Sequence, residues 1–245
     1  MMRWRASLGV CLLVFAIGLE AEPSQDVNTV ATPAATAAPL ELTLEIQSWA
    51  HRVAPPMAPP ELRLRLLLRA LADEEDGALQ EIEGYTGTAI EAFESRRADC
   101  VAFAMLFVAL SREVGVPTYF VMTRSAERFD DRGDLQVAVR HLAVGYGPVD
   151  RLRVIDFGGK SRPKRGLVEI VDDATASAIY HSNQGTQRLL RGQALAALLW
   201  LERAVELAPD LQAAQDNLAV AKRRLGRILP GQALVEMTPQ SLVLP

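Results

Sequence analysis

The sequence is poor in cysteine, histidine and aromatic residues, and it has no excess of positive charge. Its 245 residues include two cysteines, three histidines and 6% aromatic residues, and the net charge is −4. Without a basic surplus or aromatic stacking surfaces, nucleic acid is not an expected partner. Hydrophobic residues make up 49% of the chain and charged residues 23%, which is typical of a globular protein.

The N-terminus lacks a hydrophobic run that is long enough for a comfortable membrane span. Its apolar stretch, Leu8 to Leu19, is short and follows Arg3 and Arg5. This order of charge and apolarity is typical of a signal peptide, which we expect to be cleaved after Ala21. We therefore predict a periplasmic or secreted protein. Lipidation at Cys11, or an uncleaved leader, would be the alternative that ties the chain to a membrane.

Removal of this leader leaves a single cysteine, Cys100, and so excludes an internal disulfide. Asp99 is a favourable helix N-cap, residues 101–114 are apolar almost all round, and Gly115 is a favourable helix end. The pattern predicts that Cys100 opens a buried helix. A lone thiol there is either an inert core residue or a nucleophile.

A cysteine nucleophile needs a base, and the chain offers His51, His141 and His181. His141 is the best placed, because it lies in the first of two predicted strands, 136–146 and 151–159, joined by a four-residue loop. If Tyr146 pairs with Arg151, His141 lies opposite Asp156 at a distance that suits a hydrogen bond. Ala143 and Gly145 share its face, and their small side chains leave room for the start of the Cys100 helix.

These residues predict a catalytic triad in which Cys100 is the nucleophile, His141 the base and then the acid, and Asp156 the orienting group. The helix dipole and a nearby imidazolium would both favour the thiolate. A metal site using the same three residues is the alternative, but one Cys, one His and one Asp make a thin zinc signature. We expect no metal and no cofactor. A predicted polar loop, 125–134, contains Asp130, Asp131 and Asp134 but lacks the full ligand pattern for calcium.

Three stretches resemble the transglutaminase-like superfamily: RRADCVAFAMLFVALSREVGVPTYFV, RHLAVGYG and RLRVIDFGG, within about residues 85–160. The resemblance implies a papain-like α+β core, in which a Cys opens a buried helix and a His and an Asp follow on successive strands. It implies acyl transfer through a thioester. The chain departs from the pattern at Ala98, where the family commonly has Gly, and at Leu142 and Ala143, where Ala and Trp are frequent.

The C-terminal part resembles a degenerate tetratricopeptide repeat, which implies a helical hairpin. The matching positions are Gly185, Gly192, Ala197, Leu201, Ala204 and Pro209, with Leu218, Ala219 and Gly226 beginning a second copy. Such a short array cannot bury a core alone. It either caps the preceding domain or binds a protein partner.

The sequence therefore predicts an α+β protein in five parts: a signal peptide, 1–21; a flexible linker, 22–40; a transglutaminase-like domain, 41–175; a helical hairpin, 176–228; and a tail, 229–245. The expected function is hydrolysis of a peptide or amide bond in a protein or peptide substrate. The alternative is a catalytically silent scaffold that binds a protein partner through the helical repeat.

Overall fold

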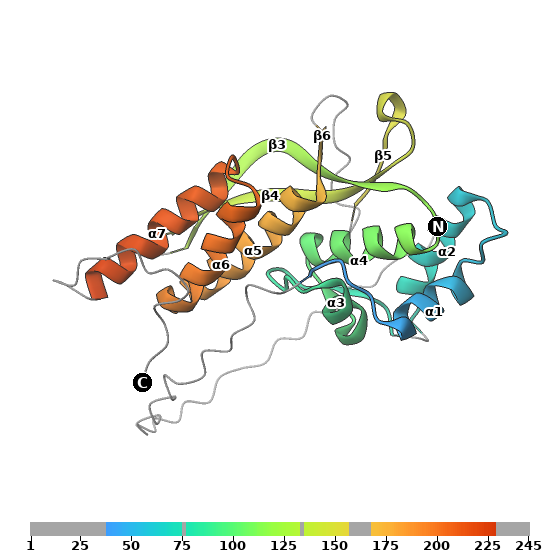
Figure 1. Ribbon diagram of the computed structural model, residues 1–245, viewed down its shortest axis with the longest axis horizontal. Helices are drawn as coiled ribbons and strands as arrows, with labels where there is room; N and C mark the ends of the chain where they lie inside the picture. Colours follow the sequence, from blue (N-terminus) through green and yellow to red (C-terminus); the bar gives the residue numbers. More distant parts are fainter. Residues whose placement is uncertain (1–37, 75–76, 133–134, 157–167, 229–245) are drawn as a thin grey trace, which may run out of the picture. The chain divides into compact units, whose positions relative to one another are not determined.

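The computed structural model describes residues 38–74, 77–132, 135–156 and 168–228, and Figure 1 traces their helices and strands. The seven helices of this part of the chain are α1 Leu44–Val53, α2 Pro60–Leu71, α3 Ala89–Ser95, α4 Cys100–Glu113, α5 Asp173–Leu190, α6 Ala194–Leu207 and α7 Gln212–Ile228. None of them is long and apolar enough to cross a membrane. The predicted leader and tail lie outside the described residues.

The strands form one larger antiparallel sheet and one small parallel pair. The sheet has the order β5-β4-β3-β6, from β5 Arg153–Ile155, β4 Leu135–Tyr146, β3 Thr118–Arg132 and β6 Val168–Val171. The parallel pair joins β1 Gln80–Glu81 to β2 Arg97–Ala98, directly before Cys100. Helix α4 packs against β3 and β4 (Figure 1). The predicted α+β class, with a buried Cys-bearing helix against an antiparallel sheet, is confirmed.

Helix α4 is the centre of the hydrophobic core. Every residue from Val101 to Ser111 is buried, as expected of a helix that is apolar almost all round. Its neighbours in the core include Leu67 of α2, Phe120 of β3, and Leu142 and Val144 of β4. A helix that is enclosed on every side has little freedom to shift, so its first residue, Cys100, is held at a defined position.

The prediction of a polar loop at 125–134 is wrong over most of that range. Strand β3 continues to Arg132, and the residues from Arg128 to Arg132 pair with those from Val139 back to Leu135 on β4. Backbone pairing satisfies the peptide groups whatever the side chains are, so a polar sequence does not prevent a strand. Asp130 and Asp131 therefore lie in β3, and Asp134 lies outside the described residues.

The C-terminal helices are α5, α6 and α7, so the range 176–228, expected to be a hairpin of two helices, contains a third helix. Ala176 and Tyr180 of α5 belong to the same core as α4. Gly185 of α5 lets α6 approach closely, because a Cβ built on it would lie 2.5 Å from Leu201 Cγ. The assignment of these helices to the tetratricopeptide class remains a prediction.

The close approach at Gly185 predicts that Gly185→Ala destabilises the protein by about 1–3 kcal/mol, because the added methyl group forces Leu201 or its helix to move. Gly226→Ala is the matched control in α7, where no atom lies within 4 Å of the new Cβ. Better helix propensity should make that variant about 0.5 kcal/mol more stable or leave it unchanged. Urea unfolding measures both, and equal effects would contradict the packing described here.

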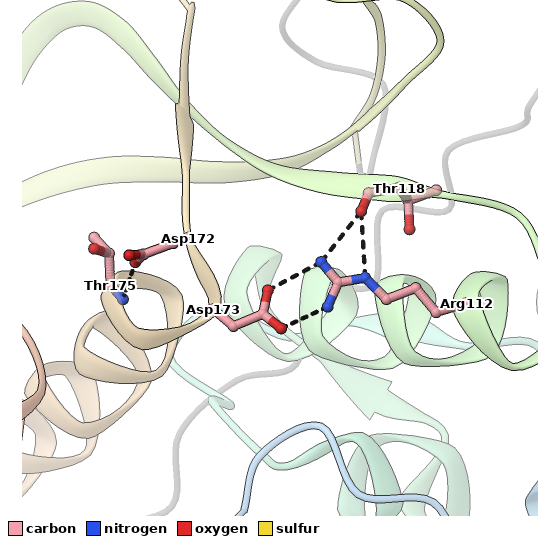
Figure 2. Close-up of polar contacts among 5 residues, drawn as sticks. All are labelled: Arg112, Thr118, Asp172, Asp173 and Thr175. Carbon is pink, nitrogen blue, oxygen red and sulfur yellow. Dashed lines mark hydrogen bonds and ion pairs between the residues drawn. The ribbon is translucent and has the colours of Figure 1, made fainter.

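Arg112, near the end of α4, joins three elements (Figure 2). Its Nη1 and Nη2 donate to the two carboxylate oxygens of Asp173, at 2.6 and 2.9 Å, and its Nε and Nη2 donate to the Thr118 carbonyl oxygen, at 3.3 and 3.2 Å. Planar guanidinium groups suit such paired contacts. Next to it, Asp172 accepts a hydrogen bond from the Thr175 backbone N–H at 2.8 Å and caps α5. The start of α5 is thereby fixed to the end of α4.

Candidate active site

Cys100 is the first residue of α4, and Asp99 caps the helix as the sequence predicts. The Asp99 Oδ1 atom accepts hydrogen bonds from the backbone N–H groups of Val101, at 3.0 Å, and Ala102, at 2.9 Å. Burial raises the pKa of the Asp99 carboxyl, and the hydrogen bonds that it accepts oppose this rise. Among the described residues, Cys100 is the only cysteine, and it is half-buried with a free thiol.

The predicted register between β4 and β5 is wrong by two residues. Tyr146 pairs with Arg153 rather than Arg151, and Gly145 pairs with Val154. A 3₁₀ turn over Val149–Arg151 lengthens the connection and displaces the pairing. A shift of two keeps every side chain on its original face, since side chains alternate with a period of two. Asp156, directly after β5, therefore lies diagonally across from His141.

His141 contacts both of the other residues of the predicted triad. Its Nε2 atom is hydrogen-bonded to Asp156 Oδ1. A second hydrogen bond joins the imidazole to the Cys100 side chain. The structure thus brings Cys100, His141 and Asp156 together, in the chain thiol–imidazole–carboxylate.

The pairing of β3 with β4 is interrupted directly beside His141. The regular register ends at the pair Thr123 and His141, and it resumes at Arg128 and Val139. Irregularities of this kind bend a strand and re-aim its side chains. The space beside Gly145 is also not what the sequence suggests, because a Cβ there would meet Val121 at 2.6 Å and Leu152 at 3.0 Å. Gly145 of β4 thus admits the side chains of Val121 and Leu152.

The surroundings of His141 raise its pKa from an ordinary value of 6.5 to about 10. The hydrogen bond to Asp156 is the largest cause, the hydrogen bond to Cys100 is the next, and burial acts in the opposite direction. His141 therefore carries a proton at neutral pH. Since the folded-state pKa is the higher one, this protonation contributes stability fully below about pH 6.5 and loses it as the pH rises through about 10.

The other two histidines lie elsewhere. His51 Nε2 is 2.9 Å from Glu113 Oε1, at the opposite end of α4 from Cys100. His181 is buried in α5, where its Nδ1 is 2.8 Å from the Ser177 carbonyl oxygen. No group of three His, Cys, Asp or Glu residues that could hold a metal ion occurs within the described ranges.

Two residues beside the site escaped sequence reasoning. The Thr86 hydroxyl donates to Asp99 Oδ2, and Gln184 Nε2 donates to the Thr86 carbonyl oxygen. Thr86 is 5% exposed and Asp99 is 8% exposed. Nothing in the local sequence pattern marks Thr86 or Gln184, because a contact between positions 86 and 184 is decided by the tertiary fold.

Comparison with known proteins places the matched part of the chain around this site. Residues 47–150 match the family model of the transglutaminase-like superfamily, a range that includes Cys100 and His141 and ends before Asp156. Neither the curated proteins nor the solved structures gave a match. Within the matched range, the Cys-bearing helix α4 precedes the His-bearing strand β4, which is the order that the resemblance implies. Residues 47–150 of this chain therefore form a transglutaminase-like domain.

Proposed function

We propose that this chain is an exported transglutaminase-like thiol enzyme that hydrolyses a peptide or amide bond in a protein or peptide substrate. One observation carries the proposal: the Cys100 thiol contacts an imidazole that is itself hydrogen-bonded to a carboxylate. A buried structural cysteine has no need of that arrangement, whereas nucleophilic catalysis requires it. Export is proposed from the N-terminal sequence alone.

In the proposed reaction, Cys100 attacks the substrate carbonyl carbon as a thiolate, with His141 protonated beside it, and forms a tetrahedral oxyanion. The Cys100 backbone N–H is a suitable donor to that oxygen, because Asp99 Oδ1 engages only the next two amides of the helix. The protonated His141 then gives its proton to the leaving amine, and a thioester remains. Water attacks the thioester with His141, now neutral, as the base. The C–S bond then breaks, which releases the acid product and returns Cys100 to the thiolate beside a protonated His141.

The two contacts of His141 suit both halves of this cycle. The hydrogen bond and the charge of Cys100 help to raise the His141 pKa, and acylation of the sulfur removes both. The imidazolium therefore becomes a stronger acid at the moment when the leaving amine needs a proton. Asp156 stays hydrogen-bonded throughout and keeps the ring oriented.

A catalytically silent scaffold is the second candidate. The observation that favours it is Ala143, which is 1% exposed and stands where the family often has a Trp. In this view the transglutaminase-like domain supports the C-terminal helices, which bind a protein partner. The acyl-transfer proposal is preferred because the scaffold gives no reason for the contacts of Cys100 with His141 and of His141 with Asp156.

Casein supplies both peptide bonds and glutamine side chains. One assay therefore distinguishes peptide-bond hydrolysis, glutamine deamidation and transamidation. The full chain is incubated with casein and biotin-cadaverine, and products are identified by mass spectrometry. We expect new peptide termini or glutamine deamidation with the wild type, and none with Cys100→Ala. Biotin incorporation would identify transamidation instead of hydrolysis. Two results would favour the scaffold. One is the same set of products from the wild type and from Cys100→Ala. The other is a wild type that forms no products and whose Cys100 also resists acylation.

A further inference from the structure

Helix α5 holds both ends of the helix that carries Cys100. At the C-terminal end of α4, Arg112 binds Asp173, the first residue of α5 (Figure 2). At the N-terminal end, Gln184 of α5 binds the Thr86 carbonyl oxygen, and Thr86 binds the cap residue Asp99. Asp173 and Gln184 are about 16 Å apart along α5, and Asp99 and Arg112 about 19 Å apart along α4, so the two attachment sites match in spacing.

The turn at Tyr85 and Thr86 fixes Asp99 through its backbone and through its side chain. The Asp99 N–H donates to the Tyr85 carbonyl oxygen at 3.1 Å, and the Thr86 hydroxyl donates to Asp99 Oδ2. The other carboxylate oxygen, Oδ1, binds the amides at the start of α4. The carboxyl group therefore joins the turn to the residues that directly follow Cys100. A displacement of this turn would be passed to the sulfur.

The orientation of the Gln184 amide is also determined. Arg188 Nη1 donates to Gln184 Oε1 at 2.7 Å, which leaves the Nε2 end to donate to Thr86. Arg188 is itself held over the ring of Trp200 in α6, with its guanidinium carbon 4.4 Å from the ring centroid. A series of contacts thus runs from α6 through Arg188, Gln184 and Thr86 to Asp99.

We propose that Thr86 and Gln184 are positioning residues for the Cys100 thiol, and that α5 is part of the framework of the active site. They act through Asp99, which fixes the position and direction of the first turn of α4. This in turn determines the contact between Cys100 and His141. Gln184 lies beyond the matched range 47–150, so the transglutaminase-like domain depends on a helix outside it. The consequence for turnover rests on the proposed function, whereas the consequence for the thiol–imidazole contact does not.

Two substitutions remove these contacts with little change of shape. Thr86→Val deletes the donor to Asp99, and Gln184→Glu replaces the donor to Thr86 by an oxygen while keeping an acceptor for Arg188. The controls are Thr86→Ser, which keeps the hydroxyl, and Gln187→Glu, which makes the same charge change on the same helix. The full chain is used throughout. Its folding is monitored by circular dichroism, Cys100 alkylation by iodoacetamide at pH 6, and the His141 pKa by NMR.

We expect Thr86→Val and Gln184→Glu to slow Cys100 alkylation about tenfold, since displacements well below 1 Å are sufficient to disturb such sites. Both should lower the His141 pKa, because its hydrogen bond to Cys100 is one of the causes of the raised value. Thr86→Ser and Gln187→Glu should behave like the wild type. If turnover is measurable, kcat should fall and KM should change little.

Folded Thr86→Val and Gln184→Glu variants with wild-type alkylation rates and an unchanged His141 pKa would overturn the proposal. So would equal effects of Gln184→Glu and Gln187→Glu. If Thr86→Val does not fold, Gln184→Glu decides, because it leaves the Thr86–Asp99 hydrogen bond in place. If no substrate is turned over but alkylation and the His141 pKa respond as expected, the positioning role stands and only the proposed function fails.

Discussion

Asp156→Ala is expected to lower the His141 pKa from about 10 toward its ordinary value and to reduce acyl transfer about a hundredfold. The hydrogen bond to Asp156 is the largest cause of the raised His141 pKa, and the carboxylate is the group that orients the ring. Asp156→Asn should cost less turnover than Asp156→Ala, because an amide oxygen can still accept from Nε2. It should nevertheless lower the pKa, since the negative charge is gone.

NMR titration of the His141 ring measures this effect without a substrate. Because the protonated ring stabilises the folded state below about pH 6.5 and not above about pH 10, the variants should lose most stability relative to the wild type near pH 6. The deficit should shrink as the pH approaches 10. A His141 pKa near 6.5 in the wild type, or one unaffected by Asp156→Asn, would show that the imidazole–carboxylate contact is not present in solution.

Cys100 and its helix were predictable because their signals are local. An N-cap, an apolar run and a terminating glycine all lie within residues 99–115, and the structure places α4 at Cys100–Glu113. The contact of His141 with Asp156 was predictable only in part. The expected loop was too short, yet the error of two residues left both side chains on the same face, so a wrong register still led to the right neighbours.

The framework around the site was not predictable from the pattern of residues. The turn with Thr86 is polar and unremarkable in the sequence, and its partner Gln184 is 98 positions away. The extension of β3 through a charged stretch is likewise decided by pairing with β4 and not by the side chains themselves. Long-range hydrogen bonds and strand pairing thus determine which elements hold Asp99, whereas the local sequence determines where the helix begins.

The protonation of His141 has a direct consequence for the reactivity of Cys100. An ordinary thiol is only about 0.3% thiolate at pH 6, and the thiolate is the nucleophile. In the proposed reaction the Cys100 thiolate is the attacking group, and the positive charge of the neighbouring His141 ring would stabilise it. His141→Ala removes the partner, so we expect alkylation of Cys100 at pH 6 to slow by about tenfold to a hundredfold, after allowing for the lower nucleophilicity of a stabilised thiolate.

His51→Ala is the matched control, because His51 contacts the opposite end of α4 at Glu113. It should leave the alkylation rate unchanged. The rates of wild type and His141→Ala should converge as the pH rises toward 10, where the imidazolium is lost and any accessible thiol is ionised. Peptide mapping separates labelling at Cys100 from labelling at Cys11.

The rate of Cys100 alkylation by iodoacetamide at pH 6, in wild type and in His141→Ala, is the most direct test of the thiol–imidazole pair. The pair predicts fast labelling of the wild type and labelling of His141→Ala that is slower by at least about tenfold. Slow labelling at the same rate in both proteins would contradict it, and Cys100 would then be an inert residue at the start of a buried helix.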